Sequence, residues 1–96
     1  MRVLVTYDVS TEDAAGRRRL RRIAQQCQNF GQRVQKSVFE CDVDEMHYES
    51  LIRALVKIIH KEDDSLRIYR LVEPLEKNVQ VFGWDRRVDF EKPLLA

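Results

Sequence analysis

One carboxylate in this 96-residue sequence stands where an ionised group is costly. Asp8 lies within the apolar run VLVTYDV, which is typical of a strand inside a sheet, where a buried charge needs partners. A structural interpretation is that Asp8 accepts hydrogen bonds from the following loop or helps to cap the next helix. A chemical one is that it binds Mg²⁺, which commonly takes one or two carboxylates and completes its shell with water and phosphate oxygens. A two-fold symmetric dimer would supply a second Asp8 if the strand end lies near the axis.

Basic residues form the second candidate site. Residues 14–39 carry seven bases and no acid, which leaves −6 for the rest of a chain whose net charge is +1. Five of these bases are arginines in the run RRRLRR, and no acid follows them at i+4 within that helix. Arginine binds phosphate through paired hydrogen bonds, so we predict contacts with nucleic-acid backbones and not with base edges. A solvated helix face, neutralised by acids between residues 42 and 49, is the alternative. The predicted nucleic-acid-binding residues are Arg17, Arg18, Arg19, Arg21, Arg22, Arg33 and Lys36.

The sequence contains no motif of a nucleophilic, nucleotide-binding or cysteine-ligated metal site. The serines stand in no glycine-bounded nucleophile turn, the two histidines fall at helix ends, and the three glycines are too scattered for a phosphate loop. Cys27 and Cys41 lie in separate apolar patterns without metal-ligand spacing, which predicts buried reduced thiols. No apolar stretch approaches the roughly 20 residues that span a bilayer. We therefore expect a cytoplasmic protein without a membrane partner.

The first half of the chain contains the elements that must position Asp8. Residues 2–9 alternate as a strand, with valines and Tyr7 on one face. Residues 10–13 supply the hydroxyl and acid that start a helix, and this helix is predicted to run to about residue 30 with Gly31 as its C-cap. Residues 32–43 are again extended. A change of parity within them predicts either a bulge or two short strands joined by a tight turn.

The second half predicts one more helix and further strands. Residues 44 and 45 begin a helix with a clean apolar stripe, which ends near the charged loop 60–64. Residues 65–72 and 79–82 are the remaining strong strand patterns, and alternation at residues 88–90 hints at a short last strand.

These elements predict one α+β domain over residues 1–96. Two helices interleaved with four or five strands fit a sandwich in which both helices cover one side of an antiparallel sheet, and the ferredoxin-like βαββαβ order matches best. The strands carry apolar side chains on both faces, although helices can cover only one. A second copy of the chain is the simplest cover for the other face, so we predict a homodimer.

Four sequence blocks together resemble one protein family. They are YDVS at residues 7–10, the arginine-rich helix at 17–22, GQRVQKSVFE at 31–40 and DSLRIYRL at 64–71. This pattern is similar to that of the second CRISPR-associated protein (Cas-two), the smaller of the two spacer-acquisition proteins, and in particular to type I-C members. The resemblance covers nearly the whole chain, and the GxRVQxSVFE block is its most specific part.

The resemblance implies a structure and an activity. It implies a ferredoxin-like homodimer with face-to-face sheets, in which a C-terminal strand and tail at about residues 83–96 pair with the partner protomer. It also implies a metal-dependent endonuclease that cleaves RNA or double-stranded DNA, with Asp8 as the catalytic residue and the ligand of Mg²⁺ or Mn²⁺ near the dimer axis. Tyr7, Arg33, Ser37 and Phe39 also fall on motif positions, and Tyr7, Ser37 and Phe39 are expected to shape the cleft. The register of the helix arginines stays open.

Two functions of different kinds follow. In the first, paired Asp8 carboxylates hold one divalent ion while the arginines position the phosphate backbone for hydrolysis. In the second, the dimer is an architectural adaptor that bridges two dimers of the CRISPR integrase and holds incoming DNA, and the chemistry belongs to the integrase. The first needs the carboxylate of Asp8, whereas the second needs only the arginines.

Overall fold

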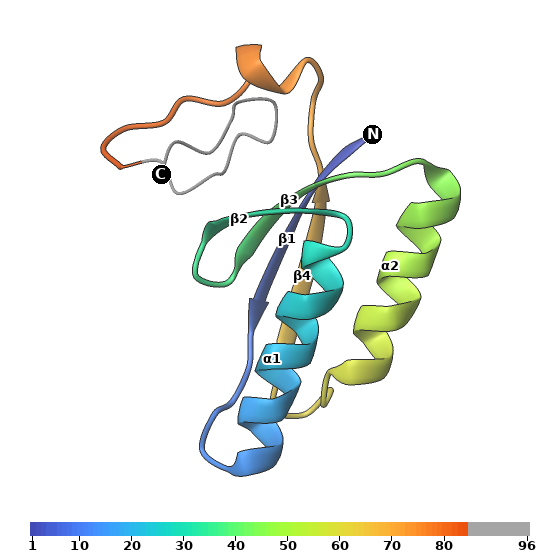
Figure 1. Ribbon diagram of the computed structural model, residues 1–96, viewed down its shortest axis with the longest axis vertical. Helices are drawn as coiled ribbons and strands as arrows, with labels where there is room; N and C mark the ends of the chain where they lie inside the picture. Colours follow the sequence, from blue (N-terminus) through green and yellow to red (C-terminus); the bar gives the residue numbers. More distant parts are fainter. Residues whose placement is uncertain (85–96) are drawn as a thin grey trace, which may run out of the picture.

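The computed structural model describes residues 1–84, in which two helices pack on one face of a four-stranded antiparallel sheet (Figure 1). The elements are β1 (Arg2–Asp8), α1 (Ala14–Gln28), β2 (Gly31–Gln35), β3 (Val38–Asp42), α2 (Glu45–Ile58), β4 (Ser65–Arg70) and the 3₁₀-helix η1 (Leu75–Lys77). The sheet order is β2-β3-β1-β4, so the predicted ferredoxin-like arrangement is confirmed. No helix among the described residues is long and apolar enough to cross a membrane.

The central strand β1 has one buried and one uncovered face. Val3, Val5 and Tyr7 are buried, whereas Leu4 and Thr6 are half-buried and Asp8 is exposed. Because β3 and β4 pair with β1 in antiparallel register, their side chains divide between the same two faces. We call the uncovered side the open face. Its residues are Leu4, Thr6 and Asp8 of β1, Val38 and Glu40 of β3, and Ser65, Arg67 and Tyr69 of β4.

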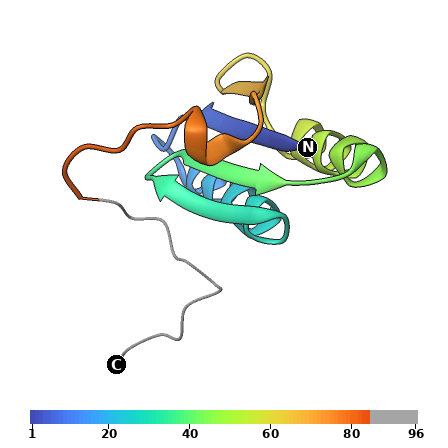
Figure 2. The same cartoon turned by 90° about the horizontal axis from the view of Figure 1, so that it is seen from above.

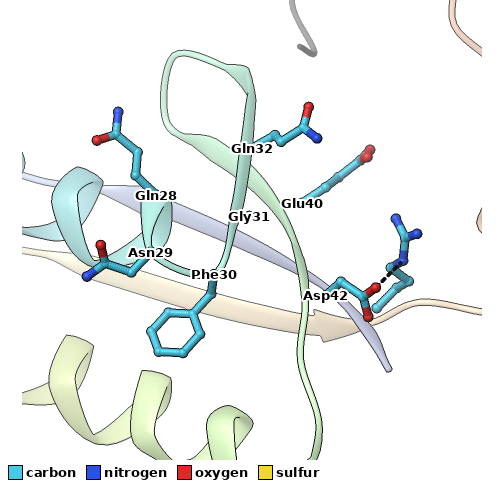
Figure 3. Close-up of a pocket in the computed structure, with 8 residues that line it drawn as sticks. Gln28, Asn29, Phe30, Gly31, Gln32, Glu40 and Asp42 are labelled. Atoms are coloured by element: carbon cyan, nitrogen blue, oxygen red, sulfur yellow. Dashed lines mark ion pairs between the residues drawn. The ribbon is translucent and has the colours of Figure 1, made fainter. Parts of the chain in front are cut away.

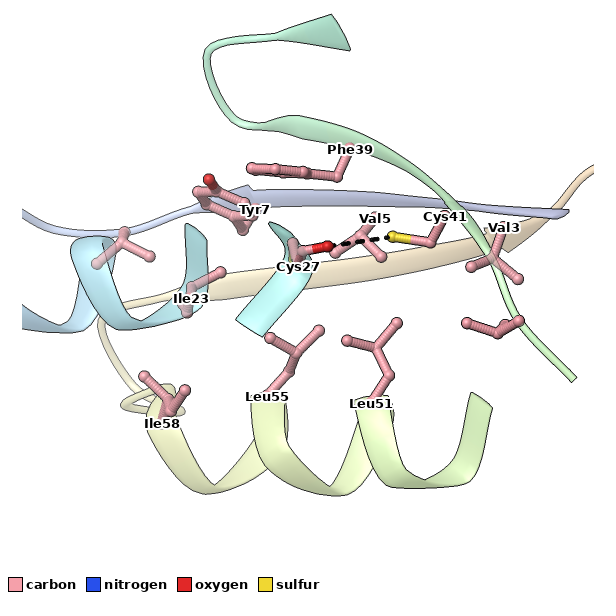
Figure 4. Packing of buried hydrophobic residues seen from close by; sticks show 12 residues of the cluster. Val3, Val5, Tyr7, Ile23, Cys27, Phe39, Cys41, Leu51, Leu55 and Ile58 are labelled. Carbon is pink, nitrogen blue, oxygen red and sulfur yellow. Dashed lines mark hydrogen bonds between the residues drawn. The ribbon is translucent and has the colours of Figure 1, made fainter. Parts of the chain in front are cut away.

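The core lies between the sheet and the two helices (Figure 4). Ile23 and Cys27 come from α1, Leu51 and Leu55 come from α2, and all four are fully buried against the inner face of the sheet. The apolar stripe predicted for the second helix is therefore confirmed, and α1 buries a stripe of its own. Burying a side chain of this size stabilises a fold by roughly 1.5–3 kcal/mol relative to exposure, so these contacts hold the helices on the sheet.

The extended segment after α1 contains both features that its parity change suggested. A tight turn separates β2 from β3, and the register between them shifts between Arg33 and Gln35. Gly31 is not the predicted C-cap, because α1 ends at Gln28 and Gly31 is the first residue of β2. A Cβ at this position would collide with the backbone carbonyl oxygen of Glu40, so close strand approach requires the glycine.

The start of α1 also differs from the prediction. Asp13 is the N-cap, and its carboxylate accepts a hydrogen bond of 2.7 Å from the backbone N–H of Gly16. The helix therefore begins at Ala14, and residues 10–12 form the loop after β1 instead of the cap. The first turn packs so closely on this loop that a Cβ on Gly16 would collide with the carbonyl oxygen of Ser10.

The predicted strand at residues 79–82 is wrong for the described part of the chain. After β4 the chain passes through η1 and then extends away from the sheet (Figure 2). An alternating pattern such as VQVF favours a pleated surface but supplies no neighbouring strand, and the sheet of this protomer offers none there. The predicted strand at 88–90, and all but the first two residues of the predicted partner-pairing tail, lie outside the described residues.

The two cysteines behave as the sequence predicts. Both are buried and free, and burial raises the pKa of Cys27 to about 12 and that of Cys41 to about 11. A thiol is reactive as its thiolate, so these side chains are inert core residues at neutral pH.

Candidate metal and nucleic-acid site

Asp8 is an exposed carboxylate at the end of the central strand. Its register partner on β4 is Ser65, and on the other side the backbone N–H of Tyr7 donates to the carbonyl of Ser37 at 3.1 Å, in the β2–β3 turn. Among residues 1–84 the Asp8 carboxylate has no hydrogen-bond or ion-pair partner. Other acids fill the two structural roles considered for Asp8. Asp13 caps α1, and Asp64 accepts a hydrogen bond from the loop after β1, at the backbone N–H of Ser10. Asp8 is therefore free to bind a ligand.

Asp64 holds the segments around Asp8 together. Its buried carboxylate accepts four hydrogen bonds: from the backbone N–H of Ser10 (3.2 Å), the backbone N–H of His60 (2.8 Å), and Nε and Nη2 of Arg19 (2.8 and 3.2 Å). Burial opposes ionisation of Asp64, but the bonds from Arg19, His60 and Ser10 outweigh it and lower its pKa below the ordinary value. Sequence analysis missed this residue, although it opens the DSLRIYRL block.

The predicted arginine cluster is divided by the helix geometry. Arg19 is committed to Asp64, and its side chain is only 17% exposed. Arg17 donates from Nη1 to the carbonyl of Thr11 at 3.3 Å. The remaining three are exposed and form no ion pair within the described chain, which makes them the available phosphate ligands of α1. They are Arg18, Arg21 and Arg22.

Tyr7 and Phe39 are core residues of the protomer and do not line an open cleft. Phe39 is fully buried, Tyr7 is 5% exposed, and their ring centroids lie 6.3 Å apart (Figure 4). The guanidinium of Arg33 covers the Phe39 ring at 5.1 Å from its centroid. Burial raises the pKa of Tyr7, and the Arg33 guanidinium opposes part of that rise. The packing of Tyr7 on Phe39 fixes the position of β1, the strand that ends in Asp8. Ser37 and Lys36 form the adjacent turn, where Lys36 is exposed.

Two open-face residues beside Asp8 were missed by sequence analysis. Ser65 is the register partner of Asp8, and Arg67 is the partner of Thr6, two residues along the same face. The guanidinium of Arg67 packs over the ring of Tyr69 at 5.2 Å. The alternation of SLRIYR contains this information, because the inward Leu66 leaves Arg67 outward. Arg67 places a cation on the same surface as the carboxylate.

The donor set at Asp8 fits a hard, water-rich cation. No group of three or more His, Cys, Asp or Glu side chains within residues 1–84 is arranged to hold a metal ion. One exposed carboxylate with free oxygens suits Mg²⁺ or Mn²⁺, which retain water ligands, and does not suit Zn²⁺, which takes three or four protein ligands. One carboxylate with water and phosphate oxygens can hold such an ion, and a two-fold dimer would add a second Asp8 if the strand ends lie near its axis.

A surface pocket lies at the other end of the sheet (Figure 3). It is lined by Arg2, Gln28, Asn29, Phe30, Gly31, Gln32, Glu40 and Asp42. Nε of Arg2 lies 3.5 Å from a carboxylate oxygen of Asp42 at its edge. Arg2 begins β1 whereas Asp8 ends it, so this pocket is separate from the predicted metal site.

The fold and these side chains define a small ferredoxin-like α+β protein with an unpaired carboxylate on its central strand and an arginine-rich first helix. The sequence profile of the family described as "CRISPR associated protein Cas2" matches residues 1–79. The chain therefore belongs to the Cas2 family, and the resemblance found in its sequence blocks is confirmed.

Individual relatives agree over nearly the whole chain. The "CRISPR-associated endoribonuclease Cas2 1" of Moorella thermoacetica is 55% identical over 95 residues, 99% of each chain. The "CRISPR-associated endonuclease Cas2" of Halalkalibacterium halodurans is 50% identical over 95 residues, again 99% of each. The crystal structure of Streptococcus pyogenes Cas2 at pH 6.5 superimposes with a TM-score of 0.79 at 47% identity, covering 86% of this chain and 100% of that one.

The Asp64 hydrogen bonds predict a pH-dependent stability. Because the pKa of Asp64 is lowered in the folded state, the unfolded chain binds more protons, and the stabilisation present above about pH 4 is lost as the pH falls through the folded pKa. Asp64→Asn should lower the melting temperature at pH 7 by roughly 5–15 °C and flatten its decline between pH 5 and 3. Circular dichroism melts would measure both effects. Glu62→Gln, an exposed neighbour, is the control; equal melting curves for both variants would contradict this role.

Proposed function

We propose that the chain is a metal-dependent endonuclease of a CRISPR system and that Asp8 is its catalytic metal ligand. The observation that carries the proposal is the exposed, unengaged carboxylate at the end of the central strand. The names of the relatives, endoribonuclease in one and endonuclease in another, support the same activity. Phosphodiester hydrolysis needs charge neutralisation at the phosphate, and a carboxylate-bound divalent ion supplies it.

The proposed mechanism assigns different tasks to different side chains. Asp8 would hold Mg²⁺ or Mn²⁺, and such an ion polarises the scissile phosphate and lowers the pKa of a bound water. Arg67 and Lys36 flank the carboxylate on the β4 side and in the β2–β3 turn, where they can bind neighbouring phosphates. Packing of Tyr7 on Phe39 keeps β1 rigid, so the carboxylate has a defined position.

The proposed substrate is a nucleic-acid backbone, either RNA or double-stranded DNA. The contacts available on the described surface are cations and a carboxylate, which recognise phosphates and not bases. The relatives' names include both endoribonuclease and the broader endonuclease, so both substrates belong in the assay.

Asp8→Asn should abolish cleavage without abolishing binding. The substitution keeps the shape of the side chain but removes the charge that binds the ion, so the rate should fall on the order of 100-fold or more. Purified protein would be assayed with Mg²⁺, with Mn²⁺ and with EDTA, on labelled RNA and on duplex DNA. Asp42→Asn, at the opposite end of the sheet, is the matched control and should cleave normally. Undiminished Mg²⁺-dependent cleavage by Asp8→Asn would refute the mechanism.

The proposed active form is a homodimer in which open faces pack together. Tyr69 on the open face is 41% exposed, and beyond β4 Val72, Val81 and Phe82 are 70%, 52% and 85% exposed. Apolar surface of this extent favours a partner. A two-fold axis near the ends of the two β1 strands would provide the second Asp8 that the metal site lacks in one protomer.

Tyr69→Glu should dissociate this dimer. A glutamate on the open face would have to be buried unpaired in the interface, which is costly, whereas it is solvated in the monomer. Sedimentation equilibrium would report the change from twice the protomer mass of 11.4 kDa to that mass. The matched control is Val56→Glu, because Val56 is 40% exposed but lies on α2. Identical dimerisation of the two variants would contradict the face-to-face arrangement.

Membership of the Cas2 family supports a role in spacer acquisition. We propose that the dimer works with the larger CRISPR integrase protein and binds the incoming DNA through the exposed α1 arginines. Such a task belongs in the cytoplasm, where the invading nucleic acid is met. The enzyme and adaptor functions make different demands on Asp8 in this setting.

Spacer acquisition in cells should therefore be measured with Asp8→Asn in place of the wild-type chain. If hydrolysis by this protein is part of acquisition, new spacers should fall to background, whereas Asp42→Asn should acquire them normally. Normal acquisition by Asp8→Asn would favour the adaptor and confine the nuclease activity to another task.

A further inference from the structure

A basic groove lies between the two helices, on their outer side. It is lined by Arg22 and Gln26 of α1 and by Ser50, Arg53, Ala54, Lys57 and Ile58 of α2. Ala54 and Ile58 form its apolar base, because Ala54 is half-buried and Ile58 is buried, whereas the three cationic side chains are exposed. The groove is therefore a shallow channel with charged walls.

The charges of this groove have no internal counter-ions. None of its lining residues is acidic, and within residues 1–84 no ion pair engages Arg22, Arg53 or Lys57. Arg53 and Lys57 are four residues apart on α2, so their side chains stand next to each other and repel. Several cations that line one groove repel each other when no acidic side chain lies between them. An anion that enters the groove relieves this repulsion.

The two walls of the groove are rows of hydrogen-bond donors, and the row on α1 continues beyond it. On α1, Arg18 lies one turn before Arg22, and Gln26 lies one turn after it with an amide that can also donate. The facing row on α2 is Arg53 and Lys57. An extended polyanion with regularly repeated charges engages such rows better than a single small anion does.

The groove and Asp8 lie on opposite sides of the molecule. Asp8 belongs to the open face of the sheet, and both helices cover the other face, with the groove on their outer surface. A phosphate bound in the groove is thus separated from the Asp8 carboxylate by the whole helix and sheet layers. Binding there cannot be the cleavage event itself.

We propose that this interhelix groove binds the phosphodiester backbone of a nucleic acid, as a second contact surface distinct from the Asp8 face. The proposal rests on the nucleic-acid function proposed above and extends it to the helix layer. Arg22 and Arg53 supply paired donors and Lys57 supplies a point charge, which is the chemistry that recognises phosphate without reading sequence. A long duplex could then contact the helix layer of a protomer while another part of it meets the end of the sheet at which Asp8 lies.

The test compares two double variants of equal charge. Arg53→Gln with Lys57→Gln removes two groove cations, and Lys61→Gln with Lys77→Gln removes two exposed cations outside the groove. Fluorescence anisotropy would give the Kd for a 30-base-pair duplex and for a single-stranded RNA of about the same length, in EDTA, over a series of salt concentrations. Arg53→Lys with Lys57→Arg keeps the charge and controls for folding.

We expect the groove variant to bind the duplex more weakly, roughly two- to fivefold for each cation removed. The slope of log Kd against log salt concentration should fall by about one for each lost contact. The outside-groove variant should keep the wild-type slope, and the charge-conserving variant should retain binding. Equal affinities and slopes for the two Gln variants would overturn the proposal, as would be found if the groove met an acidic protein surface.

Failure of this proposal is distinguishable from failure of the proposed nuclease. At saturating substrate the groove variant should cleave at the wild-type maximal rate, because Asp8 is untouched, whereas Asp8→Asn should bind with the wild-type salt slope and not cleave. Weak binding by the groove variant together with undiminished cleavage by Asp8→Asn would leave the groove in place and refute the nuclease mechanism.

Discussion

A buried carboxylate must receive hydrogen bonds from the protein that excludes water from it, and this requirement organises the end of the molecule at which Asp8 lies. Asp64 meets it with four donors from three separate segments: the loop after β1, the helix α1 and the loop after α2. Asp64 directly precedes Ser65, the register partner of Asp8. The path of the chain away from Asp8, and the angle at which α1 begins, therefore depend on one ionised side chain.

Side chains alternate between the two faces of the sheet along β1, so one face carries core residues and the other carries the exposed carboxylate of Asp8. Tyr7 and Asp8 are neighbours in sequence but face opposite sides of the sheet, so Tyr7 can pack on Phe39 while Asp8 reaches solvent. Arg33 completes this packing from the edge strand β2. Tyr7, Arg33 and Phe39 therefore serve to hold the strand that carries Asp8, although the last two come from the distant block GQRVQKSVFE.

The positive charges of the α1 arginines are likewise distributed over different sides of the molecule. The run of five arginines is continuous in sequence, but a helix turns through about 100° per residue and distributes its members around the axis. Arg19 turns inward to Asp64, whereas Arg22 turns toward the groove shared with Arg53. The chain consequently presents cations on the helix layer and, through Arg67, on the open face as well. The cations of the helix layer face away from the sheet, so they stay exposed when the open faces of two protomers pack together.

Much of this could be predicted from the sequence, because hydrophobic periodicity is a local property. It was sufficient for both helices and for four of the strands, for the buried faces of β1 and of the helices, and for the inert thiols, and the sequence blocks were sufficient for the family. It did not show that Asp8 is exposed, because the apolar run around it indicated a position where a charge is costly. Local pattern also misled: Gly31 serves close strand packing instead of a helix cap, and VQVF at residues 79–82 forms no strand in the described protomer. A β-strand needs a neighbouring strand to pair with, and the alternation of apolar residues does not indicate whether one is present.

The sequence by itself therefore determined which apolar residues are buried, which residues are charged and which carboxylate stands alone on the central strand. Only the tertiary structure decided which partners they meet. Arg19 and Asp64 are 45 residues apart, and their ion pair exists because α1 and the loop before β4 pack side by side. The meeting of Arg22 with Arg53 and Lys57 likewise depends on how two helices lie on one sheet. Such contacts arise from packing of the whole chain, which is a non-local consequence of burying its apolar faces.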